Sequence, residues 1–261
     1  MNFAGVQSVT IPEGDVKSIA IGGVTVWERK SSPSSLDYVQ DSAFLFFDGI
    51  ENAGRGVHSS SATTWTNLAN ANAPATATSG LLGAWLDDAY SFNQSGGFAC
   101  PLTNVTWPSG GITIEMAFRV SAFGTWAGRV FGTSHNTGSY KRLCFYPRNA
   151  SGAGADVCWG GDWNTGVQLE GGTKLPKNYT VAIIGSTTST GFRFRWNGKT
   201  TSYSPPYYPR DKATNITIGN EGDLARPILG DVCAVRFHAR QLTEAEIDAN
   251  AALDRQRFGV T

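Results

Sequence analysis

The sequence has no excess of charge of either sign. It contains 21 basic and 21 acidic residues among 261, so its formal net charge is zero. Proteins that hold nucleic acid through phosphate contacts normally carry a surplus of lysine and arginine, so we expect no nucleic-acid partner. No apolar run approaches the ~20 residues needed to cross a bilayer, so we also expect no membrane span.

A secretory signal and a zinc-binding cysteine pattern are also missing. The chain begins MNFAGVQSVTIPEG, without a basic segment followed by an apolar one, so we expect synthesis in the cytoplasm without a signal peptide. The four cysteines, Cys100, Cys144, Cys158 and Cys233, have no spacing typical of a zinc site. Without a signal peptide, we expect buried free thiols rather than disulfides.

The residues that are abundant indicate an all-β protein. Glycine occurs 31 times, aromatic residues make up 11% and charged residues only 16% of the chain. This composition suits many short strands joined by tight turns. About a dozen candidate strands, with no helix before the end of the chain, predict a sandwich of two antiparallel sheets. The clearest strand, 112–120, places five apolar residues on one face: Ile112, Ile114, Met116, Phe118 and Val120.

The last strand of the chain also alternates. Cys233, Val235 and Phe237 are spaced two apart, and we expect them to face the core together. Arg236 and His238 would then lie on the outer face of the sheet.

One helix is expected after that strand. Thr243 can cap it, with Glu246 as the capping-box partner. Leu242 and Ile247 have the spacing of a hydrophobic staple, and Gly259 is a natural terminator.

The first residues form a separate unit. VKSIAI and VTVWE flank Gly22-Gly23, which predicts an N-terminal β-hairpin module over 1–30, followed by a linker over 31–36 and the sandwich over 37–261. A lone hairpin is only marginally stable in water. It must therefore lean on the main domain, on a sister chain in a homo-oligomer, or on another protein.

Several segments carry a family resemblance. WTNLA (65–69), ITIEMAF (112–118), FRWNG (194–198), NITIGN (215–220) and the closing strand and helix (230–259) resemble concanavalin A-like lectin/glucanase domains of the laminin G-like kind. The resemblance implies a concanavalin A-like jelly-roll sandwich with one short C-terminal helix. It implies less about function, because this fold hosts lectins, hydrolases and adhesion modules.

A narrower resemblance concerns residues 47–69, preceded by 16–28. These look like bacterial and prophage tail-associated proteins, in which a small hairpin module precedes a laminin G-like domain. The resemblance implies a phage tail or bacterial surface protein, located on the virion or cell surface. A bacterial-surface carbohydrate would be its ligand, and the hairpin would contact other tail or surface proteins. A structural or oligomerisation module without a small ligand is the alternative.

Catalytic carboxylates are not evident. A glucanase of this fold should carry two or three carboxylates alternating along one strand, with acid and nucleophile ~5 Å apart. Glu115 stands alone on its strand, and we expect it to be partly exposed and paired with Arg119. None of the histidines lies in a hydrolase or zinc-protease motif. We therefore expect a non-catalytic binding domain rather than an enzyme, with a glycan hydrolase or lyase as the alternative.

Aromatic and polar residues gather in three stretches, 123–135, 158–164 and 202–210, which we call the mid-chain loops. Sugar sites use an aromatic face for stacking and fixed polar groups for the hydroxyls. The alternative for each loop aromatic is packing over the edge of the sandwich. The candidate ligand-binding residues are Trp126, Arg129, His135, Trp159, Asp162, Trp163, Asn164 and Tyr207.

Arg193 and Arg195 form a basic stripe along one strand face. Such a stripe is either a solvated face or a face for a ligand or a second subunit.

No cofactor is required by any motif, with calcium as the alternative. Laminin G-like relatives often hold calcium in a loop at the sandwich edge, and calcium takes ~6–8 oxygen ligands. Asp48, Asn52 and Asp223 could supply some of these oxygens. Their spacing is not that of an EF-hand.

Overall fold

The computed structural model describes residues 18–21, 24–28, 33–120, 128–133, 143–148, 154–160, 164–168, 177–205, 214–222 and 224–261. The chain divides into two units, Met1–Ser32 and Pro33–Thr261. In the first unit, β1 (Ser18–Ile21) and β2 (Val24–Glu28) pair antiparallel, as the hairpin pattern predicts.

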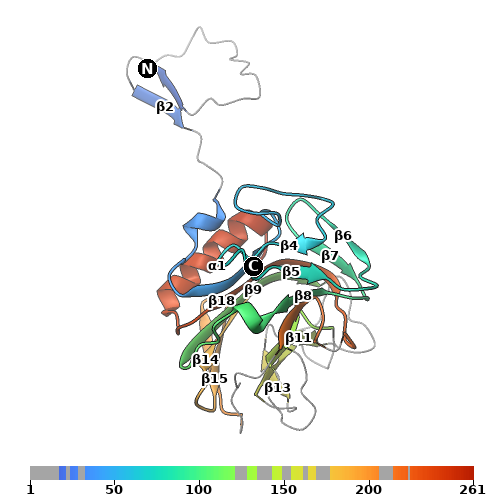
Figure 1. The fold of residues 1–261 in the computed structure, drawn as a ribbon. Helices are drawn as coiled ribbons and strands as arrows, with labels where there is room; N and C mark the ends of the chain where they lie inside the picture. The colour runs from blue at the N-terminus through green and yellow to red at the C-terminus, as the bar shows by residue number, and fades with distance from the viewer. Residues whose placement is uncertain are drawn as a thin grey trace. The chain divides into compact units, whose positions relative to one another are not determined.

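The second unit contains the remaining elements (Figure 1). Its first strands are β3 (Ala43–Asp48), β4 (Thr64–Trp65), β5 (Ala75–Ala77), β6 (Gly83–Trp85), β7 (Tyr90–Asn93), β8 (Phe98–Pro101), β9 (Gly111–Val120) and β10 (Phe131–Thr133). The later strands are β11 (Leu143–Arg148), β12 (Gly154–Trp159), β13 (Asn164–Gln168), β14 (Lys177–Ser186), β15 (Phe192–Trp196), β16 (Lys199–Tyr203), β17 (Asn215–Ile218) and β18 (Leu229–His238). Two short 3-10 turns, η1 (Ser35–Asp37) and η2 (Leu102–Asn104), and one helix, α1 (Glu244–Phe258), complete the unit.

These strands form two sheets. Sheet I has the order β13-β12-β11-β10-β17-β8-β5-β4, and sheet II has the order β16-β15-β14-β9-β18-β7-β6, with β3 also paired to β18. Neighbouring strands in both sheets run antiparallel. The predicted all-β sandwich with one C-terminal helix is therefore confirmed.

An aromatic core fills the space between the sheets. All five alternating apolar residues of β9 are buried in it, as predicted. Rings from opposite sheets meet in several pairs, among them Phe118 with Phe145 at 5.4 Å, Phe131 with Phe237 at 5.3 Å, and Trp159 with Phe192 at 5.3 Å. Offset and edge-on ring contacts of this kind stabilise a core beyond simple area burial.

The prediction for the last strand is wrong in one place. The register of β18 against β9 shifts between Val232 and Ala234, which marks a β-bulge. The extra residue reverses the alternation, so Val232 joins Val235 and Phe237 in the main core. Cys233 instead lies in a separate buried cluster that includes Phe258 of the helix. All four cysteines are free and buried, as expected.

Helix α1 covers the outer face of sheet II and forms a third layer (Figure 1). Near its start, Ile247 packs with Leu242 and with Ala182 and Ile184 of β14, which confirms the predicted staple. Thr243 and Glu246 make the predicted capping box, and Gly259 ends the helix in the left-handed conformation at φ 64°. Among the described residues, no helix is long and apolar enough to cross a membrane.

The helix cap can be tested by mutation. The Thr243 hydroxyl accepts from the Glu246 amide at 3.3 Å, and the Glu246 carboxylate accepts from the Thr243 amide at 2.8 Å. We expect Thr243→Ala to lower the free energy of unfolding by about 1 kcal/mol in urea denaturation, because the first turn loses that acceptor. The control Thr201→Ala, at an exposed threonine of β16, should change the free energy of unfolding by less than about 0.5 kcal/mol. Equal losses in the two variants would contradict this role of the cap.

Candidate functional site

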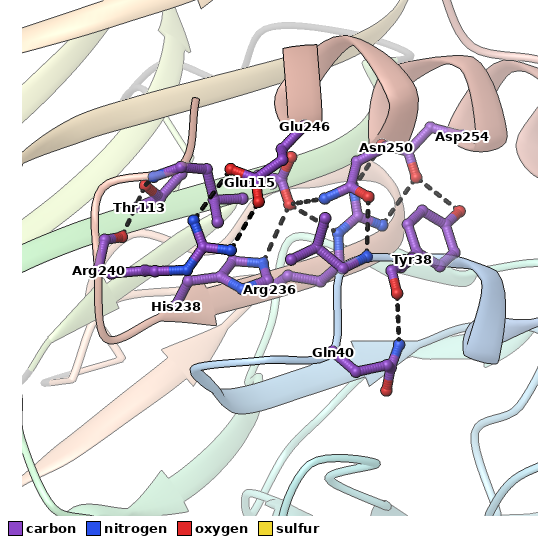
Figure 2. A network of polar contacts seen from close by, with 12 residues as sticks. Tyr38, Gln40, Thr113, Glu115, Arg236, His238, Arg240, Glu246, Asn250 and Asp254 are labelled. Atoms are coloured by element: carbon purple, nitrogen blue, oxygen red, sulfur yellow. Dashed lines mark hydrogen bonds and ion pairs between the residues drawn. The ribbon is translucent and has the colours of Figure 1, made fainter. Parts of the chain in front are cut away.

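The outer face of sheet II carries polar residues that α1 covers. Strand alternation points Glu115 of β9 and Arg236 and His238 of β18 away from the core. Figure 2 shows these side chains converging beneath Asn250 and Asp254 of the helix. All five are buried. We call this group the helix clamp.

Arg236 is the centre of the helix clamp. Its two terminal nitrogens donate to the two carboxylate oxygens of Asp254 at 2.8 and 2.6 Å, and its Nε donates to Glu115 at 3.3 Å. The guanidinium carbon also lies 4.2 Å from the centre of the Tyr38 ring. Burial lowers the pKa of Arg236, but the two carboxylates outweigh it and hold the pKa above its ordinary value.

Glu115 is fully buried, which corrects the expectation of a partly exposed carboxylate. One oxygen accepts from Arg236, from His238 Nε2 at 3.2 Å and from Asn250 Nδ2 at 2.8 Å. Burial raises the pKa of Glu115, but the combined effect of these donors is larger and opposite. The pKa of Glu115 therefore lies below its ordinary value. Arg119, the expected partner, instead pairs with Asp88 at 2.7 Å and with Asp231. The sequence pattern gave no sign that a helix would cover this face.

A groove of about 520 Å³ opens beside the helix clamp, between α1 and strands β14 and β15. Its apolar lining includes Ala182, Ile247 and Ala251, and its polar lining includes Asn197, Asp248 and Arg255. Glu115 of the helix clamp also contributes to its lining. A concave site of this size falls within the ~300–1,000 Å³ typical of ligand pockets.

Arg195 closes one side of the groove. It donates to both oxygens of Asp248 at 2.9 and 2.6 Å and to Glu244 at 2.8 Å. The hydrogen bonds that Arg195 donates to Asp248 raise the pKa of Arg195, and they lower the pKa of Asp248. The predicted basic stripe is thus partly covered by the acidic first turns of α1. The sequence signal was present, because Glu244 and Asp248 are four residues apart on one helix face.

Most of the predicted sugar-binding residues lie outside the described residues. These are Trp126, His135, Asp162, Trp163 and Tyr207. Asn164 begins β13, where the structure describes its backbone pairing with Cys158.

The two predicted residues whose side chains are described are both buried. Trp159 is 1% exposed and packs in the core against Phe192 and over Gly185, where an added Cβ would lie 2.2 Å from its ring. Arg129 is 1% exposed and bonded to Glu221 at 3.3 Å. In these positions, neither side chain presents a face to a surface ligand.

The candidate calcium ligands are also engaged with the protein. One oxygen of Asp48 accepts two backbone amides, and the other accepts from Arg257 at 2.8 Å. Burial raises the pKa of Asp48 to about 6, against the lowering effect of Arg257. The side-chain amide of Asn52 donates to the Ser59 carbonyl and accepts from the Ser59 backbone amide, both at 2.8 Å. Asp223 lies outside the described residues, and within them no three acidic, histidine or cysteine side chains gather as metal ligands.

Two antiparallel sheets around an aromatic core, with a helix clamped to one outer face, define a lectin-like β-sandwich. The chain belongs to the concanavalin A-like lectin/glucanases superfamily, whose model Laminin_G_3 matches residues 93–248, more than half of the chain. The resemblance drawn from the sequence is confirmed at this level. The likeness to phage and prophage tail proteins stays a prediction.

Solved structures of similar fold include sialidases. Trypanosoma rangeli sialidase in complex with sialic acid is 14% identical with a TM-score of 0.60, and the match covers 94% of this chain and 36% of that one. A second structure of Trypanosoma rangeli sialidase is 12% identical with a TM-score of 0.59, and the match again covers 94% of this chain and 36% of that one. The CBM40 of a Ruminococcus gnavus IT-sialidase reaches a TM-score of only 0.47 at 15% identity, over 63% of this chain and 96% of that one. No curated protein matches the sequence.

These comparisons contradict the expectation that the chain is not an enzyme. Solved structures of this fold include sialidases, which are enzymes, so the fold gives no ground for excluding enzymatic activity. The missing carboxylate pair was weak evidence against an enzyme, because some glycoside hydrolases do not use two carboxylates. An identity of 14% over 36% of the sialidase establishes a shared fold and no particular activity.

The helix clamp leads to a stability prediction. Asp254 accepts two bonds from Arg236, one from Tyr38 at 2.8 Å and one from Thr180 at 2.6 Å. We expect Asp254→Ala to lower the free energy of unfolding by about 3–5 kcal/mol, because it leaves a buried guanidinium without its main partner.

The matched control is Asp248→Ala on the same helix. Asp248 also pairs with an arginine, but its side chain is 49% exposed, so the loss should be about 1 kcal/mol or less. Both free energies would be measured by urea denaturation. Similar losses of unfolding free energy in the two variants would show that the buried helix clamp contributes no more to stability than the exposed ion pair.

Proposed function

We propose that the sandwich is a glycan-recognition domain of a phage-tail-associated, prophage-tail-associated or bacterial surface protein. Its ligand is a carbohydrate of the bacterial surface. Membership in the lectin/glucanase superfamily is the observation that carries this proposal. The sialidases of similar fold support it, because Trypanosoma rangeli sialidase binds sialic acid and 2,3-difluorosialic acid.

The proposed recognition surface consists of the three mid-chain loops. Trp126 and Trp163 supply aromatic faces for the C–H surface of a sugar ring, and Asp162, His135 and Tyr207 supply hydrogen bonds to its hydroxyls. Tyrosine and tryptophan suit such surfaces because each combines a rigid apolar ring with a polar end.

The site is tested with a glycan array. The full chain should bind a restricted set of bacterial-surface glycans, and Trp163→Ala should weaken that binding at least about tenfold, equivalent to about 1.4 kcal/mol of lost stacking. Leu36→Ala, at a leucine that is 62% exposed, is the control and should bind like the native chain. Binding that ignores the Trp163 substitution would place the site elsewhere, and no binding to any glycan would overturn the proposed function.

The first unit is proposed to attach the sandwich to neighbouring proteins on the virion or cell surface. It is a separate compact unit whose β1–β2 hairpin is a two-stranded sheet. Two strands alone are marginally stable in water, so this unit needs a surface to pack on. A second copy of the chain is one such surface, which favours an oligomeric attachment module.

Light scattering tests the attachment role. The full chain should be oligomeric, and a chain without residues 1–32 should be monomeric, because the main core lies entirely in the second unit. Thermal unfolding should occur at a similar temperature in both proteins. A full chain that is already monomeric would contradict self-association through this unit.

A further inference from the structure

The groove between α1 and the β14–β15 pair has the features of a ligand site that no comparison assigns. Its floor is apolar, formed in part by the buried residues Ala182 and Ile247 and by the half-buried Ala251. Asn197, Asp248 and Arg255 supply polar groups to its lining. An apolar floor with a few convergent polar groups is the usual composition of a small-molecule site.

The walls of the groove are held in place before any ligand binds. On one side, the helix clamp fixes α1 through the bonds from Arg236 to Asp254. On the other side, Asn197 and Gly198 form the tight turn between β15 and β16, with φ of 48° and 71°. A preformed site loses less conformational freedom on binding, which favours affinity for a small ligand.

The charges around the groove limit what it can hold. Arg195 is engaged by Asp248 and Glu244, and Arg255 is the other arginine of the lining. Two arginines and two carboxylates leave no surplus of positive charge for an acidic ligand. Glu115, which also contributes to the lining, already accepts three hydrogen bonds from the protein.

Free polar groups remain at the mouth of the groove. Asn197 is exposed, and its side chain makes no hydrogen bond with the described residues. Arg255 is exposed and makes no ion pair with them. Together with the half-exposed carboxylate of Asp248, they supply both donors and acceptors to the lining of the groove. A hydroxyl group both donates and accepts, so this mixture matches vicinal hydroxyls rather than a single ionic group.

We propose that this groove is a subsite for one uncharged sugar residue. The sugar ring lies on the floor formed by Ile247 and Ala251, and its hydroxyls bond Asn197, Asp248 and Arg255. The inference rests on the proposed function, since it supplies a second contact for a glycan that the mid-chain loops also bind. It goes beyond that function by assigning the contact to the helix face of the sandwich.

The test uses the full chain and nuclear magnetic resonance titration. The probes are three uncharged sugars, glucose, galactose and N-acetylglucosamine, and one acidic sugar, N-acetylneuraminic acid. At least one uncharged sugar should shift the backbone amides of Asn197, Gly198 and Ala251, and the acidic sugar should shift them less. No shift with any uncharged sugar, or a larger shift with the acidic one, would overturn the inference.

Filling the groove provides the decisive variant. Ala251→Phe places a ring over the floor and should weaken uncharged-sugar binding at least about tenfold. Ala249→Phe is the control, because it puts the same ring on an exposed position of α1 outside the lining of the groove. This variant should bind uncharged sugars like the native chain. Equal binding by both variants would overturn the inference.

A second variant covers the case in which Ala251→Phe perturbs folding. Asn197→Gly keeps the turn, because glycine readily adopts positive φ, but removes the amide. Loss of about one hydrogen bond should weaken binding about fivefold. Unchanged affinity in this variant would remove Asn197 from the site and, with it, the proposed hydroxyl recognition.

The glycan array separates this inference from the proposed function. If array binding falls with Trp163→Ala but not with Ala251→Phe, glycan recognition stands and the groove subsite fails. If neither the array nor the titration shows binding, both proposals fail.

Discussion

The buried pairing of Arg236 with Asp254 is the interaction on which the arrangement of this domain depends. Side chains of both residues are almost completely removed from water, with 1% and 0% exposure. A charge in that position is tolerated only when its partner and its hydrogen bonds are in place. Arg236 belongs to sheet II and Asp254 to α1, so the pair stabilises the helix in one position on the sheet. Figure 2 shows Tyr38, from the segment before β3, bonded to the same carboxylate.

Several other features follow from the position of the helix. Glu115 becomes a buried acceptor rather than a surface carboxylate, and Phe258 closes a small apolar cluster over the β-bulge of β18. The groove exists because α1 lies over β14 at one side and leaves a gap toward β15. A helix bound only by apolar contacts could slide by small amounts, whereas a bidentate pair fixes its register. The polar network therefore defines the shape of the surface proposed to hold a sugar.

The two proposed glycan contacts differ in their physical basis. The mid-chain segments are proposed to bind by stacking on tryptophan, whereas the groove has an apolar floor with mixed donors and acceptors. Two weak contacts on one molecule can give useful affinity for a polymer, because the second contact forms at high effective concentration. The sialidases of similar fold show that this architecture also occurs in enzymes, so catalysis is a question about particular side chains rather than about the fold.

Many of the strands and the capped helix could be predicted from the sequence, because they depend on local periodicity and short-range capping. The superfamily was indicated by the resemblance of short segments to known domains. The alternation along β9 and the Thr243–Glu246 box are each contained within a few residues. Which polar residues are buried could not be predicted from the sequence, because it depends on long-range packing: Glu115 and Asp254 are 139 positions apart and both bind Arg236. The β-bulge that moves Cys233 off the core face could not be read from alternation, because the sequence pattern there is regular. The site was least predictable, because a groove arises from the packing of α1 against distant strands and has no pattern of its own.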